Sequence, residues 1–121
     1  MSKNFEIKVQ YRFEAARKLT QLPINHPCSQ IHGHGFLLTL TLFGPLNQKL
    51  GWLRDYHEIE TLVRPIIKKL DHHYLNDIPE LSNPTSENIC IYLYEQIKPL
   101  LSELSKVTLA ETPTTECSYP F

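Results

Sequence analysis

The sequence predicts an α+β domain in which two helices cover one face of an antiparallel sheet. Two segments near the start of the chain alternate polar and apolar residues, two middle segments repeat apolar residues at helical spacing, and shorter strand-like segments follow at the end. The predicted order is therefore strand, strand, helix, helix, strand, strand (ββααββ). A length of 121 residues suits one compact unit, and we expect a single domain over residues 1–121.

The first two predicted strands are defined by a period of two. In residues 5–17 one phase holds Phe5, Ile7, Val9, Tyr11, Phe13 and Ala15. In residues 32–43 one phase holds Phe36, Leu38, Leu40 and Leu42, and Gly44 with Pro45 ends the strand. The stretch from about residue 20 to residue 31 is rich in Pro, Asn and Ser and is expected to be a loop.

The period changes to that of a helix from Asp55, which is a suitable N-cap, and apolar residues recur up to Leu70. Pro65 is expected to kink this helix. After a loop over residues 71–82, a second helix opens within residues 83–87. Its apolar face is Ile89, Leu93, Ile97, Leu100, Leu101 and Leu104, with a bend at Pro99. Residues 106–112 and 117–119 complete the sheet.

Composition excludes several classes of function. A net charge of −1 gives no electrostatic footprint for nucleic acid or for a membrane surface. The first ten residues lack a continuous apolar core, so we expect neither a signal peptide nor a membrane span there. Three cysteines, an odd number at low density, favour a reducing cytoplasm. A domain this small gains stability by association, which favours a homo-oligomer.

Polar side chains occupy the apolar phase at the ends of three predicted strands. One step beyond Ala15 lies Arg17, the second strand carries His32 and His34 in its buried phase, and the third ends at Glu111. Buried ionisable groups are costly unless they are paired or functional. If the strands adjoin, these side chains converge on one pocket. The alternative is that each strand ends there and its last residue turns into solvent.

His32-Gly33-His34 is the sharpest local motif. Residues two apart on a strand point to the same side, which suits two imidazoles on one metal ion. Cys28 precedes the motif and is a third ligand, a nucleophile or base, or an inert thiol.

Asp71 and His72 directly follow the first predicted helix. An aspartate beside a histidine orients the imidazole and raises its basicity, as in acid–base relays. The alternative is a helix C-terminus with a favourable imidazolium and a solvated carboxylate.

Taken together, these motifs resemble the 6-pyruvoyl-tetrahydropterin synthase superfamily, and their order is most similar to its 6-carboxytetrahydropterin synthase branch in queuosine (deazapurine) biosynthesis. The resemblance covers nearly the whole chain and rests on Cys28-x-x-x-His32-Gly-His34, Leu70-Asp71-His72, Pro84-Thr85-Ser86-Glu87-Asn88 and Glu111-Thr112. It implies a tunnelling fold (T-fold), in which oligomerisation joins sheets into a barrel, and a homohexamer built as a dimer of trimers with sites between subunits. It also implies conversion of 7,8-dihydroneopterin triphosphate to 6-carboxytetrahydropterin with loss of triphosphate and acetaldehyde.

Site roles follow from the same resemblance. Cys28 would be the proton-abstracting thiolate, with Asp71 and His72 as the relay. Glu111 would hold the pterin ring, since a carboxylate accepts two parallel hydrogen bonds from an amino-pyrimidine edge. Thr85 and Ser86 would contribute to the same pocket.

His32 and His34 would bind zinc, but the family's third zinc ligand is a histidine at the position that Arg17 occupies here. Arginine stays protonated and has no lone pair to donate. Three interpretations remain open: His26 or Cys28 completes the metal site; Arg17 binds the substrate and supplies the stabilising charge in place of a metal; or the site serves another pterin-like ligand or a different metal.

Overall fold

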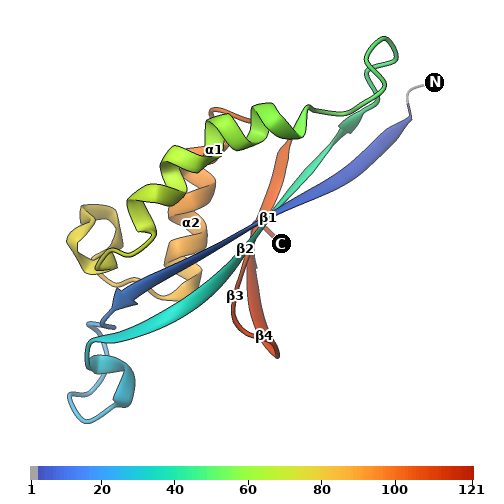
Figure 1. The fold of residues 1–121 in the computed structure, drawn as a ribbon. Coiled ribbons are helices and arrows are strands. Elements are labelled where there is room, and N and C mark those ends of the chain that lie inside the picture. The colour runs from blue at the N-terminus through green and yellow to red at the C-terminus, as the bar shows by residue number, and fades with distance from the viewer. Residues whose placement is uncertain (1–2) are drawn as a thin grey trace.

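The computed structural model, which describes residues 3–121, confirms the predicted order of elements and the position of both helices on one face of an antiparallel sheet (Figure 1). The elements are β1 (Asn4–Arg17), β2 (His32–Pro45), α1 (Tyr56–Leu70), α2 (Ser86–Ile97), β3 (Leu104–Thr112) and β4 (Thr115–Tyr119). Three short 3₁₀ turns lie in the connections: η1 (Pro27–Ser29), η2 (Leu75–Asp77) and η3 (Pro79–Leu81).

The sheet has the order β1-β2-β3-β4, with every neighbouring pair antiparallel and with β1 and β4 at its edges. The register of β1 on β2 pairs Phe13 with Phe36 and Arg17 with His32. The register of β2 on β3 pairs Leu38 with Leu109. The end of β1, the start of β2 and the end of β3 therefore lie at the same end of the sheet.

The core fills the space between the sheet and the two helices. The predicted apolar phases face inward, and Phe13, Phe36, Leu38, Leu40, Ile59, Val63, Leu93 and Leu109 are among the buried side chains. Burial follows the phase of β1 only from Tyr11 onward, because the first half of β1 extends beyond the helices (Figure 1). Phe5 is accordingly exposed.

The helix starts agree with the capping rules, while the predicted end of the second helix is wrong. Asp55 caps α1 by accepting from the amide of His57, and α1 continues through Pro65 to Leu70. The second helix was expected to reach Leu104, but α2 ends at Ile97. Proline lacks an amide hydrogen and clashes with the preceding turn, so the chain leaves the helix next to Pro99. Beyond it, Leu101 in the turn and Leu104 at the start of β3 are buried in the core, whereas Leu100, predicted on the apolar face, is exposed.

Residues 71–82, expected to be a plain loop, contain η2 and η3 and lie along the edge of β1. The amide of Ala16 donates to the carbonyl of His73 at 3.0 Å, and Ala16 forms an isolated parallel bridge with Tyr74. This contact brings residues 71–74 beside the same end of the sheet. Among the described residues, no helix combines the length and apolar character needed to cross a membrane.

Candidate functional site

Arg17, His34 and Glu111, predicted from their strand phases, do converge at one end of the sheet. The alternation that directs Phe13 and Ala15 inward also directs Arg17 inward, and the side chain of Arg17 is only 4% exposed. One guanidinium nitrogen of Arg17 donates to the carbonyl of Pro84 at 3.0 Å, and the other pairs with a carboxylate oxygen of Glu111. These contacts exclude the alternative in which Arg17 turns into solvent.

Glu111 is held between β1 and the start of α2. Its Oε1 accepts from Arg17, and its Oε2 accepts from the hydroxyl of Ser86. Ser86 is the first residue of α2, so the positive end of the helix dipole lies beside this carboxylate and stabilises its charge. The hydroxyl of Thr85 caps α2 by accepting from the amide of Asn88 at 3.1 Å.

The two histidines of the His-Gly-His motif lie together, as predicted. Their ring centroids are 4.7 Å apart, with one ring edge-on to the other. Nδ1 of His32 lies 2.7 Å from the carbonyl of Gln30, and since a carbonyl accepts, this nitrogen carries the proton. In the neutral ring Nε2 of His32 is then the acceptor, and this nitrogen is buried with no hydrogen-bond partner among the described residues.

The surroundings of His34 lower its pKa. Burial lowers its pKa, and the positive charge of Arg17 lowers it further, while Glu111 opposes both effects. Its Nε2 lies 3.7 Å from Oε1 of Glu111. With a lowered pKa, His34 is a neutral imidazole near pH 7, so its contact with Glu111 is polar rather than ionic.

These residues do not fit a zinc site of the usual kind, which uses three protein ligands in an enzyme. Within residues 3–121 there is no group of three or more His, Cys, Asp and Glu side chains that could hold a metal ion. His26, the candidate third ligand, instead caps η1, where its Nδ1 accepts from the amide of Cys28 at 3.1 Å. Cys28 is partly exposed on η1 and is a free thiol.

Asp71 and His72 form the predicted pair at the C-terminus of α1. Oδ1 of Asp71 lies 2.9 Å from Nδ1 of His72 and also accepts from the backbone amide of Glu14 at 2.9 Å. The hydrogen bond donated by the Glu14 amide lowers the pKa of Asp71, and the charge of His72 lowers it further. His72 has a φ of 60°, an uncommon conformation for a residue other than glycine. It is held there by its own amide, which donates to the carbonyl of Glu14.

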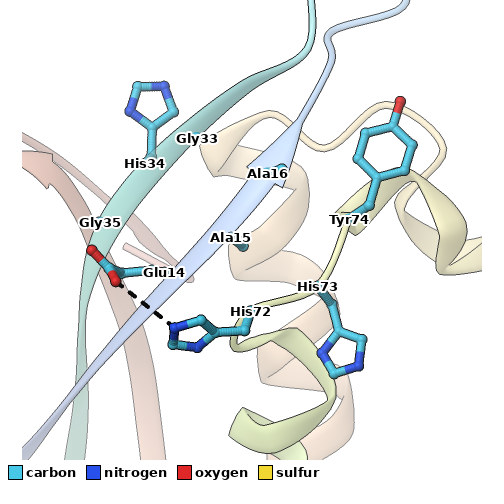
Figure 2. A pocket seen from close by; sticks show the side chains of 9 residues that line it. All are labelled: Glu14, Ala15, Ala16, Gly33, His34, Gly35, His72, His73 and Tyr74. Carbon is cyan, nitrogen blue, oxygen red and sulfur yellow. Dashed lines mark ion pairs between the residues drawn. The ribbon is translucent and has the colours of Figure 1, made fainter.

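An open pocket of about 490 Å³ at this end of the sheet is lined by His34 of the first group and by His72 of the second. Figure 2 shows that His34 projects from β2 on one side of β1, while His72 and His73 lie on the other side. Glu14 faces His72, with 4.0 Å between Oε2 and Nε2. The structure thus brings together Arg17, His34, Glu111 and Ser86 as one group and Asp71 with His72 as another.

Sequence reasoning missed three contributors to these groups. Glu14 lies in the outward phase of β1, and its contribution is mainly through its backbone, which carries no sequence signal. Pro84 likewise contributes a carbonyl oxygen. The ring of Phe36 lies 5.3 Å from the guanidinium carbon of Arg17, and the shared phase of these two residues could have indicated that contact.

Comparison with known proteins adds an independent line of evidence. Residues 6–120 match the family model described as 6-pyruvoyl tetrahydropterin synthase. The 6-carboxy-5,6,7,8-tetrahydropterin synthase of Synechocystis is 30% identical over 117 residues, covering 91% of this chain and 88% of that protein. The 6-pyruvoyl tetrahydrobiopterin synthase of Dictyostelium discoideum is 34% identical over 90 residues, covering 70% of this chain and 67% of that protein. The structure of Caenorhabditis elegans 6-pyruvoyl tetrahydropterin synthase superposes with a TM-score of 0.88 at 25% identity, over 98% of this chain and 96% of that one.

Proposed function

The chain belongs to the 6-pyruvoyl tetrahydropterin synthase family, and from this premise we propose that it is a lyase of the 6-carboxytetrahydropterin synthase type. Its substrate is 7,8-dihydroneopterin triphosphate, its product 6-carboxy-5,6,7,8-tetrahydropterin, and its pathway queuosine (deazapurine) biosynthesis. The relatives of that name at about 30% identity over most of the chain support this choice within the family.

The observation that supports catalysis, rather than binding alone, is the contact of 2.9 Å between Oδ1 of Asp71 and Nδ1 of His72. A carboxylate that accepts from Nδ1–H leaves Nε2 of the imidazole free to exchange a proton with the substrate. In the proposed reaction Cys28 removes a proton from the substrate side chain, and the Asp71–His72 pair relays it. Glu111 accepts hydrogen bonds from the amino-pyrimidine edge of the pterin, with Ser86 beside it.

We propose that the working form is a homo-oligomer in the cytoplasm, in which neighbouring sheets join into the barrel of a T-fold hexamer. Two features support association. The edge strand β4, and the part of β1 before the contacts of residues 71–74 with Glu14 and Ala16, each have a side on which another strand can pair. In addition, Cys28 lies on η1 whereas the Asp71–His72 pair follows α1, and a neighbouring chain can supply one of the two partners to a shared site.

Turnover of 7,8-dihydroneopterin triphosphate, with the product identified by mass spectrometry, tests the proposal. We expect 6-carboxytetrahydropterin from the wild-type chain and a loss of at least about 100-fold in Cys28→Ala, the scale expected when an acid–base group is removed. Asn25→Ala, an exposed change in the same loop, is the matched control and should keep the wild-type rate. A chain that binds neopterin but releases no product would contradict the proposed reaction.

The second candidate is a pterin-binding member of the family with altered specificity or without turnover. The observation that favours it is Arg17, which holds the carboxylate proposed to anchor the pterin. Under this function, binding to the protein quenches or shifts the fluorescence of neopterin, and the Glu111→Gln change weakens that binding. The Cys28→Ala change then has no effect on binding or on any product.

A further inference from the structure

Arg17 occupies the position at which the family resemblance implies a zinc ligand, and the structure shows what it does there instead. It is the last residue of β1 and lies opposite His32 in the register of the two strands. Its side chain is almost fully buried, at 4% exposure. An isolated buried charge is very costly, so the surroundings of Arg17 must compensate it.

That compensation comes from three elements of the fold. Just before α2, the carbonyl of Pro84 accepts a hydrogen bond from the Arg17 guanidinium at 3.0 Å. The β3 strand provides the carboxylate of Glu111, which pairs with the same guanidinium. The ring of Phe36 on β2 lies 5.3 Å from the guanidinium carbon. A guanidinium can bond two acceptors and stack on a ring at the same time, whereas an ammonium group lacks this geometry.

The same carboxylate oxygen links the guanidinium to the histidines. Oε1 of Glu111 pairs with Arg17 and lies 3.7 Å from Nε2 of His34. A divalent cation bound at His32 and His34 would therefore meet the positive charge of Arg17 at short range. If Glu111 turned to bind the cation, the guanidinium would lose its counter-charge inside the protein, which is strongly unfavourable.

We propose that this site binds its ligand without a divalent metal ion and that Arg17, held through Glu111, is its fixed positive charge. Arg17 acts as a positioning residue, because its buried guanidinium fixes the carboxylate that faces the ligand. The two imidazoles then serve as hydrogen-bonding groups, and Nε2 of His32, which lacks a partner among the described residues, accepts a hydrogen bond from the ligand. The proposal concerns the same site as the proposed function but is tested without turnover.

The test is the zinc content of the chain, produced in zinc-supplemented medium and purified without chelator. We expect far less than one zinc per wild-type chain and no rise in melting temperature when zinc is added. The Arg17→His variant supplies a third imidazole and removes the repelling charge, so we expect it to gain close to one zinc per chain. Its melting temperature should rise with added zinc, because a ligand that binds only the folded state stabilises it.

Two double variants locate the gained ion. Adding His34→Ala to Arg17→His should abolish zinc binding, whereas adding His57→Ala, a change at the start of α1, should leave it intact. If Arg17→His fails to fold, a calorimetric zinc titration of the wild-type chain decides the question alone.

Stoichiometric zinc in the wild-type chain, removed by a chelator with a fall in melting temperature, would overturn the proposal. So would a folded Arg17→His variant that gains no zinc. Turnover by a zinc-containing wild-type chain would refute this inference and leave the proposed function standing; a metal-free chain without turnover would do the reverse.

Discussion

The ion pair between Arg17 and Glu111 gives the first prediction, at the scale of the residue. Glu111→Gln removes the counter-charge of a guanidinium that is buried, while the side chain of Glu111 is itself 26% exposed. We therefore expect the free energy of unfolding to fall by about 2 kcal/mol, somewhat below the loss seen for fully buried pairs. Chemical denaturation followed by circular dichroism measures it.

Two comparisons show whether the pair is responsible for that loss. Glu116→Gln removes a carboxylate from an exposed position on β4 and should change the stability little. The double variant Arg17→Gln with Glu111→Gln should recover part of the loss, because no buried charge then remains. If the double variant is as unstable as the sum of the two single changes, Arg17 and Glu111 are not energetically coupled.

Strand alternation predicted which face Arg17, His34 and Glu111 share, and the structure agrees. It did not predict which of them touch. Contact between Arg17 and Glu111 depends on two successive strand registers and on how deep a long side chain lies under α2. Neither the strand register nor the depth of the side chain can be inferred from the periodicity of the sequence. The left-handed backbone at His72 is a similar case, because histidine there carries no signal of the kind that glycine would.

At the scale of the element, the segment after α1 fixes the end of β1, and Asp71 makes the central contact. Its carboxylate accepts from the amide of Glu14, and this bond lowers its pKa. We expect Asp71→Ala to accelerate hydrogen exchange at the amide of Glu14, while the amide of Val9, paired with Leu40 farther along the hairpin, exchanges as before. Nuclear magnetic resonance reports both amides.

The control is Asp77→Ala, which removes an exposed aspartate from η2 in the same segment. The sign of the pH dependence follows from the lowered pKa of Asp71. The contribution of its charged form is present above the ordinary aspartate range and is lost as the pH falls through the lowered value. Protection of the Glu14 amide should therefore weaken in acid in the wild-type chain and not in Asp71→Ala. Equal acid sensitivity in both chains would show that another group controls this contact.

Helix and strand starts were predictable because capping residues and alternation are local signals, as at Asp55. The end of α2 was not, since Leu100, Leu101 and Leu104 continue the helical spacing although Leu104 begins β3. A few apolar residues satisfy both periods, and only Pro99 distinguished them. The docking of residues 71–74 on β1 was also hidden, because it is made by backbone groups.

At the scale of the whole molecule, Tyr11, which packs between the sheet and α1, makes the stability of the fold depend on pH in the alkaline range. Its ring is buried beneath the guanidinium of Arg64, at 4.8 Å. Burial, followed by the charge of Glu60, raises the pKa of Tyr11 from 10.0 to about 12. The folded state therefore keeps the phenol neutral where the unfolded chain ionises it. This contribution to stability is complete below pH 10 and is lost as the pH rises toward 12.

The measurement is the free energy of unfolding across that alkaline range. We expect Tyr11 to account for a loss on the order of 1–2 kcal/mol, which Tyr11→Phe should remove from the pH dependence. Tyr56→Phe alters an exposed tyrosine and should keep the wild-type slope. A Tyr11→Phe variant with the wild-type slope would mean that other groups cause the alkaline loss.

The placement of the proposed catalytic residues on separate elements makes assembly testable. Cys28 and His72 lie on separate elements, and the proposed reaction requires them in one site. If the two residues come from different chains, an inactive Cys28→Ala variant and an inactive His72→Ala variant can complement each other. In mixed oligomers refolded from equal amounts, random association leaves about a quarter of the sites with both native residues. We therefore expect the mixture to regain about a quarter of the wild-type rate, although each variant alone has almost none. A refolded mixture of the expected mass that stays inactive would place Cys28 and His72 of each site in the same chain, and the proposed sharing of the site between subunits would then be wrong.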